Sequence, residues 1–127
     1  MKIQIIGLPG AGKTTGILSY LKTTPLDIQY LDIRHFAGRY RDRRFKKALL
    51  GAAHPVIAES ACGVSTVDGT VIAVRPPVQR VYSQLLQRDK TLDEDYLSLL
   101  STQMIPAHYT IGVPEELPNL LRELLEG

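Results

Sequence analysis

"GLPGAGKTT", residues 7–15, is the most specific pattern in this sequence. Gly7, four further residues and then Gly12-Lys13-Thr14 fit the pattern G-x-x-x-x-G-K-[ST]. The apolar, β-branched run at residues 2–6 predicts a buried strand before the pattern, and helical periodicity predicts a helix after Lys13. The pattern therefore lies between a strand and a helix, which is the context that a phosphate-binding loop requires.

Each residue type in this loop has a chemical reason to be there. Glycines let successive backbone N–H groups turn inward toward phosphate oxygens, and the following helix presents its positive N-terminal end. Lys13 can reach the β- and γ-phosphates, and the hydroxyl of Thr14 can ligate the accompanying Mg²⁺. We expect ATP or GTP to bind on Gly7, Pro9, Gly10, Ala11, Gly12, Lys13, Thr14 and Thr15.

Length and composition limit the remaining choices. The chain has 127 residues, 44% of them hydrophobic and 22% charged, which predicts one folded domain over residues 1–127. Cys62 is the only cysteine in the sequence, which excludes an intramolecular disulfide and a cysteine-cluster metal site. The sequence has no apolar run long enough to cross a bilayer and no signal-peptide pattern, so we expect a cytoplasmic protein without a membrane partner.

Strand and helix patterns alternate along the chain, which predicts an α/β fold with a five-stranded, mostly parallel sheet and helices on both faces. After the first strand and helix we expect strands at 26–33, 55–59, 70–74 and 107–113, and helices at 36–50, 76–88, 92–103 and 114–127. The connection at 60–69 is shorter than a parallel crossover usually needs. This short length predicts either a tight turn of helix at 60–69 or a local topology that differs from the parallel arrangement described above.

The loop and the order of elements resemble those of the small P-loop kinases, a group that includes nucleoside-monophosphate, shikimate and gluconate kinases. The resemblance implies a three-layer P-loop NTPase fold that transfers the γ-phosphoryl of Mg²⁺-ATP to a small acceptor such as a nucleotide or nucleoside. It also implies a basic acceptor-side segment at 34–50 and a short lid-like segment at 76–104.

The lid-like segment carries arginines in places where the resembling kinases use them. "QLLQR", residues 84–88, keeps the R-x-x-x-R spacing of their lid but has glutamine at the first position. The resemblance implies that Arg88 neutralises charge on the transferring phosphoryl. Arg75 and Arg80 are further candidates for substrate binding, and the alternative for these arginines is an exposed position without a ligand.

Two acidic residues follow predicted strands. Asp32 and Glu59 lie at the carboxyl ends of the second and third strands, where open α/β sheets place their ligand crevice. The resemblance implies that Asp32 orients or deprotonates the acceptor, and that Glu59 holds Mg²⁺ together with Thr14. The alternative is that each carboxylate caps a loop or pairs with an arginine.

Residues 34–47 hold seven of the fifteen Lys and Arg residues against a single acid, Asp42. An anionic acceptor could bind here, because guanidinium groups suit phosphate and carboxylate. The candidates are Arg34 and Arg39 first, then Arg41, Arg43 and Arg44. A nucleic-acid backbone is the other possible partner, with Tyr40 and Phe45 as stacking surfaces, and a solvated helix face is the third interpretation.

Three functions remain open on the sequence alone. The leading one is a small kinase. The second is a nucleotide-dependent switch or slow ATPase that acts through a partner or nucleic acid, and the third is a polynucleotide 5′-hydroxyl kinase, which would use the loop and the basic segment together.

Overall fold

The computed structural model describes residues 1–65, 68–87 and 94–127. Its centre is one sheet of five strands in the order β2-β3-β1-β4-β5, with every pair of neighbours parallel. The strands are β1 (Lys2–Ile6), β2 (Gln29–Asp32), β3 (Val56–Ser60), β4 (Thr70–Val74) and β5 (Tyr109–Ile111). The predicted α/β class with a five-stranded parallel sheet is therefore confirmed.

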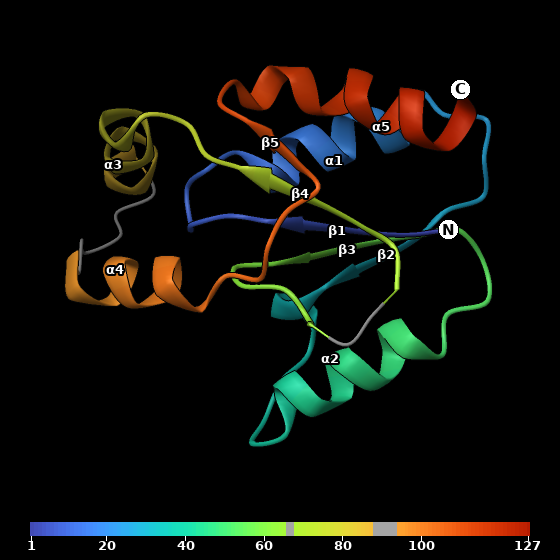
Figure 1. Cartoon of the computed structure of the whole chain (residues 1–127), viewed down its shortest axis with the longest axis horizontal. Helices are drawn as coiled ribbons and strands as arrows, with labels where there is room; N and C mark the ends of the chain where they lie inside the picture. The colour runs from blue at the N-terminus through green and yellow to red at the C-terminus, as the bar shows by residue number, and fades with distance from the viewer. Residues whose placement is uncertain (66–67, 88–93) are drawn as a thin grey trace.

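Helices form a layer on each side of this sheet (Figure 1). One face is covered by α1 (Lys13–Leu21) and α5 (Leu117–Glu126), and α2 (Arg41–Leu50) lies on the other. Two more helices, α3 (Val78–Gln87) and α4 (Glu94–Gln103), lie beyond the carboxyl ends of the strands (Figure 1). Within residues 1–65, 68–87 and 94–127, no helix combines the length and the apolar character that a membrane span needs.

The face under α1 and α5 holds the largest apolar cluster. Its fully buried members include Ile3, Ile5, Ile57 and Ile72 from the sheet and Ile17, Tyr20, Leu117 and Leu121 from the helices. Gly16 allows the two helices to approach closely, since a Cβ built on it would lie 2.8 Å from Cδ2 of Leu117. The hydroxyl of Tyr20 donates a hydrogen bond to Glu126 at 2.6 Å, which fastens the last turn of α5 to α1.

The other face is filled from α2 by Phe45 and Leu49, which are 1% and 0% exposed. Phe45 lies edge-on to Phe36, with ring centroids 5.7 Å apart. The prediction of Phe45 as a stacking surface for nucleic acid is therefore wrong, because the hydrophobic cluster on β2 and β3 takes up this ring. Tyr40, by contrast, is 55% exposed.

The connection from β3 to β4 is a parallel crossover that passes β1, because β1 lies between the two strands in the sheet. A tight turn of helix is one predicted alternative, but residues 61–65 and 68–69 of the connection contain no helix. A different local topology is the other, but β3 and β4 both run parallel to β1 as in an ordinary parallel sheet. The buried side chain of Gln4 binds it to the sheet by two hydrogen bonds with the backbone of Val64. The sheet face is thus covered here by loop in place of helix.

Several element boundaries differ from the expected ones, for local reasons. The predicted strand 26–33 ends at Asp32, whose carboxylate caps the short helix η1 (Ile33–His35) by accepting from the N–H of Arg34 at 2.9 Å. The helix predicted from 36 begins at Arg41, after Gly38 adopts a φ of 93°. At the C-terminus, η2 (Pro114–Glu116) precedes α5, and Pro118 lies in the first turn of α5.

Candidate functional site

The phosphate-loop residues form a tight turn between β1 and α1. Gly10 and Gly12 have φ values of 85° and 91°, in the left-handed region that glycine reaches most easily. Neighbouring elements also approach both residues: a Cβ would lie 3.1 Å from the carbonyl oxygen of Val81 at Gly10, and 2.9 Å from Cβ of Pro114 at Gly12. Because α1 begins directly after this turn, its first-turn N–H groups face the loop as an anion-binding cradle.

The lysine of the loop is buried. Lys13 is 8% exposed, and its Nζ donates to the carbonyl oxygen of Gly7 and, at 3.4 Å, to that of Ser60. Burial lowers the pKa of Lys13 to about 8, although the nearby carboxylate of Glu59 opposes this shift. The two carbonyl oxygens that accept hydrogen bonds from the Lys13 amine carry only partial negative charge. A phosphate group in the cradle would supply a full negative charge beside this amine.

The two carboxylates chosen from the sequence lie side by side. Asp32 and Glu59 are partners in the register of β2 and β3, and they are 1% and 4% exposed. The hydroxyl of Thr14 lies 2.7 Å and 2.9 Å from the two carboxylate oxygens of Glu59 and donates to them. Thr14 and Glu59, the predicted metal ligands, are thus in direct contact, and Asp32 lies beside Glu59 through the parallel register.

Tyr30 is a member of this cluster that the sequence analysis did not single out. Its hydroxyl donates to Glu59 at 2.5 Å and lies 3.2 Å from Asp32. Burial, together with the hydrogen bond to Glu59, raises the pKa of Tyr30. The signal was present in the sequence, because Tyr30 stands two positions before Asp32 on one strand and therefore shares its face of the sheet.

Arg34 joins the carboxylates to the loop. Its guanidinium donates to Asp32 through Nη2 at 2.5 Å and through Nε at 3.1 Å, and Nη2 also donates to Oγ1 of Thr14 at 2.7 Å. Burial of Asp32 would raise the pKa of its carboxyl, but the hydrogen bonds and charge of Arg34 outweigh burial and hold that pKa below its usual value. The same pairing raises the pKa of Arg34.

The residues at the end of the loop fit a magnesium ion. Mg²⁺ prefers oxygen ligands in octahedral geometry, commonly one or two from carboxylates and the rest from phosphate and water. The hydroxyl of Thr14 and the carboxylate of Glu59 are such ligands in mutual contact, with Asp32 on the neighbouring strand. Across the described part of the chain, no group of three or more His, Cys, Asp or Glu residues could hold a metal by itself. Water or phosphate oxygens would complete the coordination of an ion held by Thr14 and Glu59.

The other predicted arginines lie in different surroundings. Arg80 on α3 forms an ion pair with Glu115 of η2, and Arg75 is exposed at the end of β4, with its guanidinium 3.9 Å from the sulfur of Met104. Arg39 lies on the loop before α2. Arg88 falls outside the described residues, so its predicted role stays a prediction. Among the predicted arginines that the structure describes, Arg34 is hydrogen-bonded to the phosphate loop.

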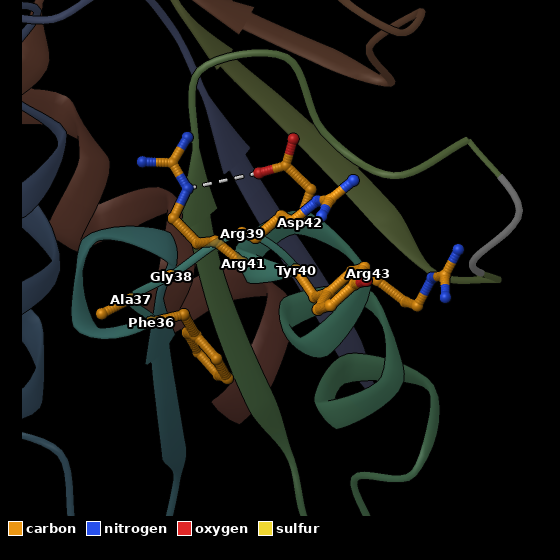
Figure 2. Close-up of a pocket in the computed structure, with 8 residues that line it drawn as sticks. All are labelled: Phe36, Ala37, Gly38, Arg39, Tyr40, Arg41, Asp42 and Arg43. Atoms are coloured by element: carbon orange, nitrogen blue, oxygen red, sulfur yellow. Dashed lines mark hydrogen bonds and ion pairs between the residues drawn. The ribbon is translucent and has the colours of Figure 1, made fainter.

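Residues 36–43 line an open, basic pocket of about 530 Å³. Figure 2 shows its lining, which consists of Phe36, Ala37, Gly38, Arg39, Tyr40, Arg41, Asp42 and Arg43. The guanidinium carbons of Arg39 and Arg43 lie 5.7 Å and 5.5 Å from the centre of the Tyr40 ring, within range of a cation–π interaction. Because η1 follows Asp32 directly, this pocket is joined to the carboxylate cluster by a few residues of chain.

Comparison with solved structures identifies the fold. Shikimate kinase from Acinetobacter baumannii in complex with shikimate matches with a TM-score of 0.62 and 19% identity, over 98% of this chain and 93% of that one. A sugar kinase from Janibacter sp. matches with a TM-score of 0.67 and 14% identity, over 98% and 94%. The Pnkp1/Rnl/Hen1 RNA repair complex matches with a TM-score of 0.58 and 11% identity, over 98% of this chain but 45% of that one.

No protein-family model and no curated protein sequence matches this chain. At these low identities the structural matches show the fold alone. The chain has the three-layer α/β fold of the small P-loop kinases, as the resemblance in the sequence predicted.

Proposed function

We propose that this protein is a small kinase that transfers the γ-phosphoryl of Mg²⁺-ATP to a small-molecule acceptor. The observation that carries this proposal is the contact between Thr14 of the phosphate loop and Glu59 of β3, beside the buried amine of Lys13. A pair of oxygen ligands and a positive charge lie side by side here, which supports binding of a metal–triphosphate complex. The kinase fold of the structural neighbours supports the same function.

The residues divide the reaction between them. The N–H groups at the start of α1 and the amine of Lys13 bind the β- and γ-phosphates, and Thr14 and Glu59 hold the metal. A bound Mg²⁺ would neutralise charge that develops on the phosphates. The bond from the γ-phosphorus to the bridging oxygen breaks and leaves ADP, while the acceptor hydroxyl oxygen forms the new bond to phosphorus.

Asp32 is better suited to orienting the acceptor hydroxyl than to removing its proton. The lowered pKa of Asp32 makes it a weak base, and phosphoryl transfer depends more on positioning and charge stabilisation than on proton removal. The proton can pass to Asp32 or to water as the new bond forms. Arg34 and Arg39, on the chain that follows Asp32, would hold an anionic group of the acceptor.

A phosphoryl-transfer screen tests this function. γ-Labelled ATP with Mg²⁺ is offered to nucleosides, nucleoside monophosphates, small hydroxy acids and oligonucleotides with a 5′-hydroxyl. Transfer of label to one acceptor class, lost in Lys13→Ala but kept in the control Lys22→Ala, would establish the kinase and its substrate. Lys22 is the matched control because it is an exposed lysine at the far end of the same helix.

Hydrolysis to free phosphate without any labelled acceptor would overturn the kinase proposal. The protein would then be a slow ATPase or a nucleotide-dependent switch. GTP in place of ATP in the same screen decides the nucleotide preference.

A nucleic-acid acceptor is the second candidate, and the exposed ring of Tyr40 between two arginines favours it. Aromatic side chains stack on bases, and arginines neutralise the backbone. Binding of a single-stranded oligonucleotide should then weaken steeply with salt and fall in Tyr40→Ala. Tyr109→Ala is the control, because Tyr109 is 43% exposed on β5 at the opposite edge of the sheet. Equal binding by both variants would remove this candidate.

A further inference from the structure

The guanidinium of Arg34 contacts the oxygen atoms of Thr14, Asp32 and Glu59 that could hold a metal ion at the phosphate loop, a place called the metal position below. Its Nη2 is 2.5 Å from Asp32, 2.7 Å from Oγ1 of Thr14 and 3.7 Å from Oε2 of Glu59. The two carboxylates are almost completely buried, and this guanidinium contacts both of them from one side. A side chain of the protein therefore already supplies positive charge at the metal position.

A metal and Arg34 cannot share this position. The hydroxyl oxygen of Thr14 donates a hydrogen bond to Glu59 and accepts one from Nη2 of Arg34, which occupies one of the two lone pairs of this oxygen. The same nitrogen also contacts both carboxylates, so a metal ion bound to these three groups would meet it. Mg²⁺ binds oxygen at roughly 2.0–2.1 Å, which is closer than the guanidinium nitrogen lies. Both cations would then be within contact distance of each other and would repel each other, and without nucleotide only the two carboxylates would neutralise them.

Arg34 has a route out of the cluster. Its side chain is 56% exposed although the carboxylate that it contacts is 1% exposed, so the guanidinium can leave toward solvent. The backbone N–H of Arg34 keeps a separate hydrogen bond of 2.9 Å to Asp32, which does not depend on the guanidinium. Asp32 would therefore keep its orientation after the side chain leaves. The pocket at 36–43 begins two residues further along the chain.

We propose that Arg34 is a displaceable internal cation that occupies the metal position in the nucleotide-free protein. Arg34 leaves this position when the metal enters with the nucleotide, and the freed guanidinium becomes available to an anionic acceptor. Only this last step rests on the proposed kinase function. Metal entry and acceptor binding are then coupled, because each one favours the state in which Arg34 is displaced.

Binding of Mn²⁺ alone, followed by its electron paramagnetic resonance signal, tests the displacement. Arg34→Gln should bind Mn²⁺ at least about tenfold more tightly than the unmodified protein, because the carboxylates lose their competing cation. Arg39→Gln is the matched control: it removes one arginine from the same segment but not from the cluster, and it should bind Mn²⁺ as the unmodified protein does. Adding Glu59→Gln to Arg34→Gln should abolish the gain.

Equal Mn²⁺ affinity of Arg34→Gln and the unmodified protein would overturn the proposal. A nuclear magnetic resonance measurement on the unmodified protein does not depend on the variant folding. The Nε–H signal of Arg34 should shift when Mg²⁺ and ADP are added together and stay in place when ADP is added with a chelator. A signal that stays in place in both cases would also overturn the proposal.

These measurements separate this inference from the proposed function. They use metal or product nucleotide without any acceptor, so a failed phosphoryl-transfer screen leaves their outcome unchanged. A successful screen combined with unchanged Mn²⁺ binding in Arg34→Gln would keep the kinase and remove the displaced arginine.

Discussion

The side-chain amide of Gln4 in the central strand β1 pairs with the backbone of Val64, accepting from its N–H at 2.8 Å and donating to its carbonyl oxygen at 3.0 Å. Gln4 is 2% exposed. Through this pair of bonds, the loop between β3 and β4 is held against a sheet face that a helix covers in most parallel crossovers. The buried polar side chain between Ile3 and Ile5 is thus explained by the hydrogen bonds that it forms with the backbone of Val64.

Gln4→Leu should lower the free energy of unfolding by about 1–3 kcal/mol, because it removes both partners of the half-buried backbone groups of Val64. Urea unfolding followed by circular dichroism measures the change. Gln79→Leu is the control, since Gln79 is exposed on α3 and its replacement should change stability little. Equal effects of the two substitutions would contradict the role given to Gln4.

Gly16→Ala should destabilise the packing of α1 on α5. The new Cβ would lie 2.8 Å and 3.1 Å from Cδ2 and Cβ of Leu117, and the resulting overpacking costs about 1–3 kcal/mol. The better helix propensity of alanine returns at most about 1 kcal/mol. Thermal unfolding of Gly16→Ala beside Ser19→Ala, an exposed position on the same helix, separates the two effects. A more stable Gly16→Ala would refute the close approach.

Nucleotide affinity should fall as pH rises above about 8, the pKa of Lys13 in the nucleotide-free protein. Bound phosphate favours the charged amine and raises its pKa, so above pH 8 binding must take up a proton. Above pH 8 the nucleotide affinity then drops by up to about tenfold per pH unit. Below pH 8 the amine of Lys13 is already protonated, so this residue adds no pH dependence to the affinity. Calorimetric titrations over this range measure the change, with Lys13→Met expected to bind weakly and without this pH dependence. Constant affinity of the unmodified protein above pH 8 would contradict the prediction.

The thiol of Cys62 should react slowly with iodoacetamide at neutral pH. It is half-buried, its Sγ donates to the carbonyl oxygen of Leu100 at 3.5 Å, and burial raises its pKa. Because the thiolate is the reactive form, the rate should rise with pH only above the range of an ordinary thiol. Mass spectrometry measures the rate at which iodoacetamide alkylates Cys62 in the folded protein, and the urea-unfolded chain is the reference. Equal rates in the two states at neutral pH would show that the thiol is free.

The phosphate loop could be predicted from the sequence because its chemistry is local. The glycines, the lysine and the threonine stand on nine consecutive residues, 7–15, and the flanking patterns place a strand before them and a helix after them. The positions of Asp32 and Glu59 could be predicted too, since parallel strands end at one edge of the sheet. Their functional roles, like those of Arg39, Arg75, Arg80 and Arg88, stay predictions.

The contacts of Phe45 and Arg34 could not be assigned in the same way. Phe45 and Tyr40 are both aromatic residues in a basic segment, and the helix begins five residues later than expected, at Arg41, so that Phe45 turns into the core. Arg34 belongs by composition to the basic surface, yet its guanidinium contacts two buried carboxylates.

The order of strands and helices, the α/β class and the phosphate loop follow from the sequence alone, because hydrophobic period and glycine pattern act over a few neighbouring residues. The cluster of Thr14, Asp32, Arg34 and Glu59, and the hold of Gln4 on the loop at Val64, depend on the folded chain. Those contacts join residues as far as 60 positions apart. They exist because strand register and the packing of buried polar groups are satisfied across the whole sheet at once.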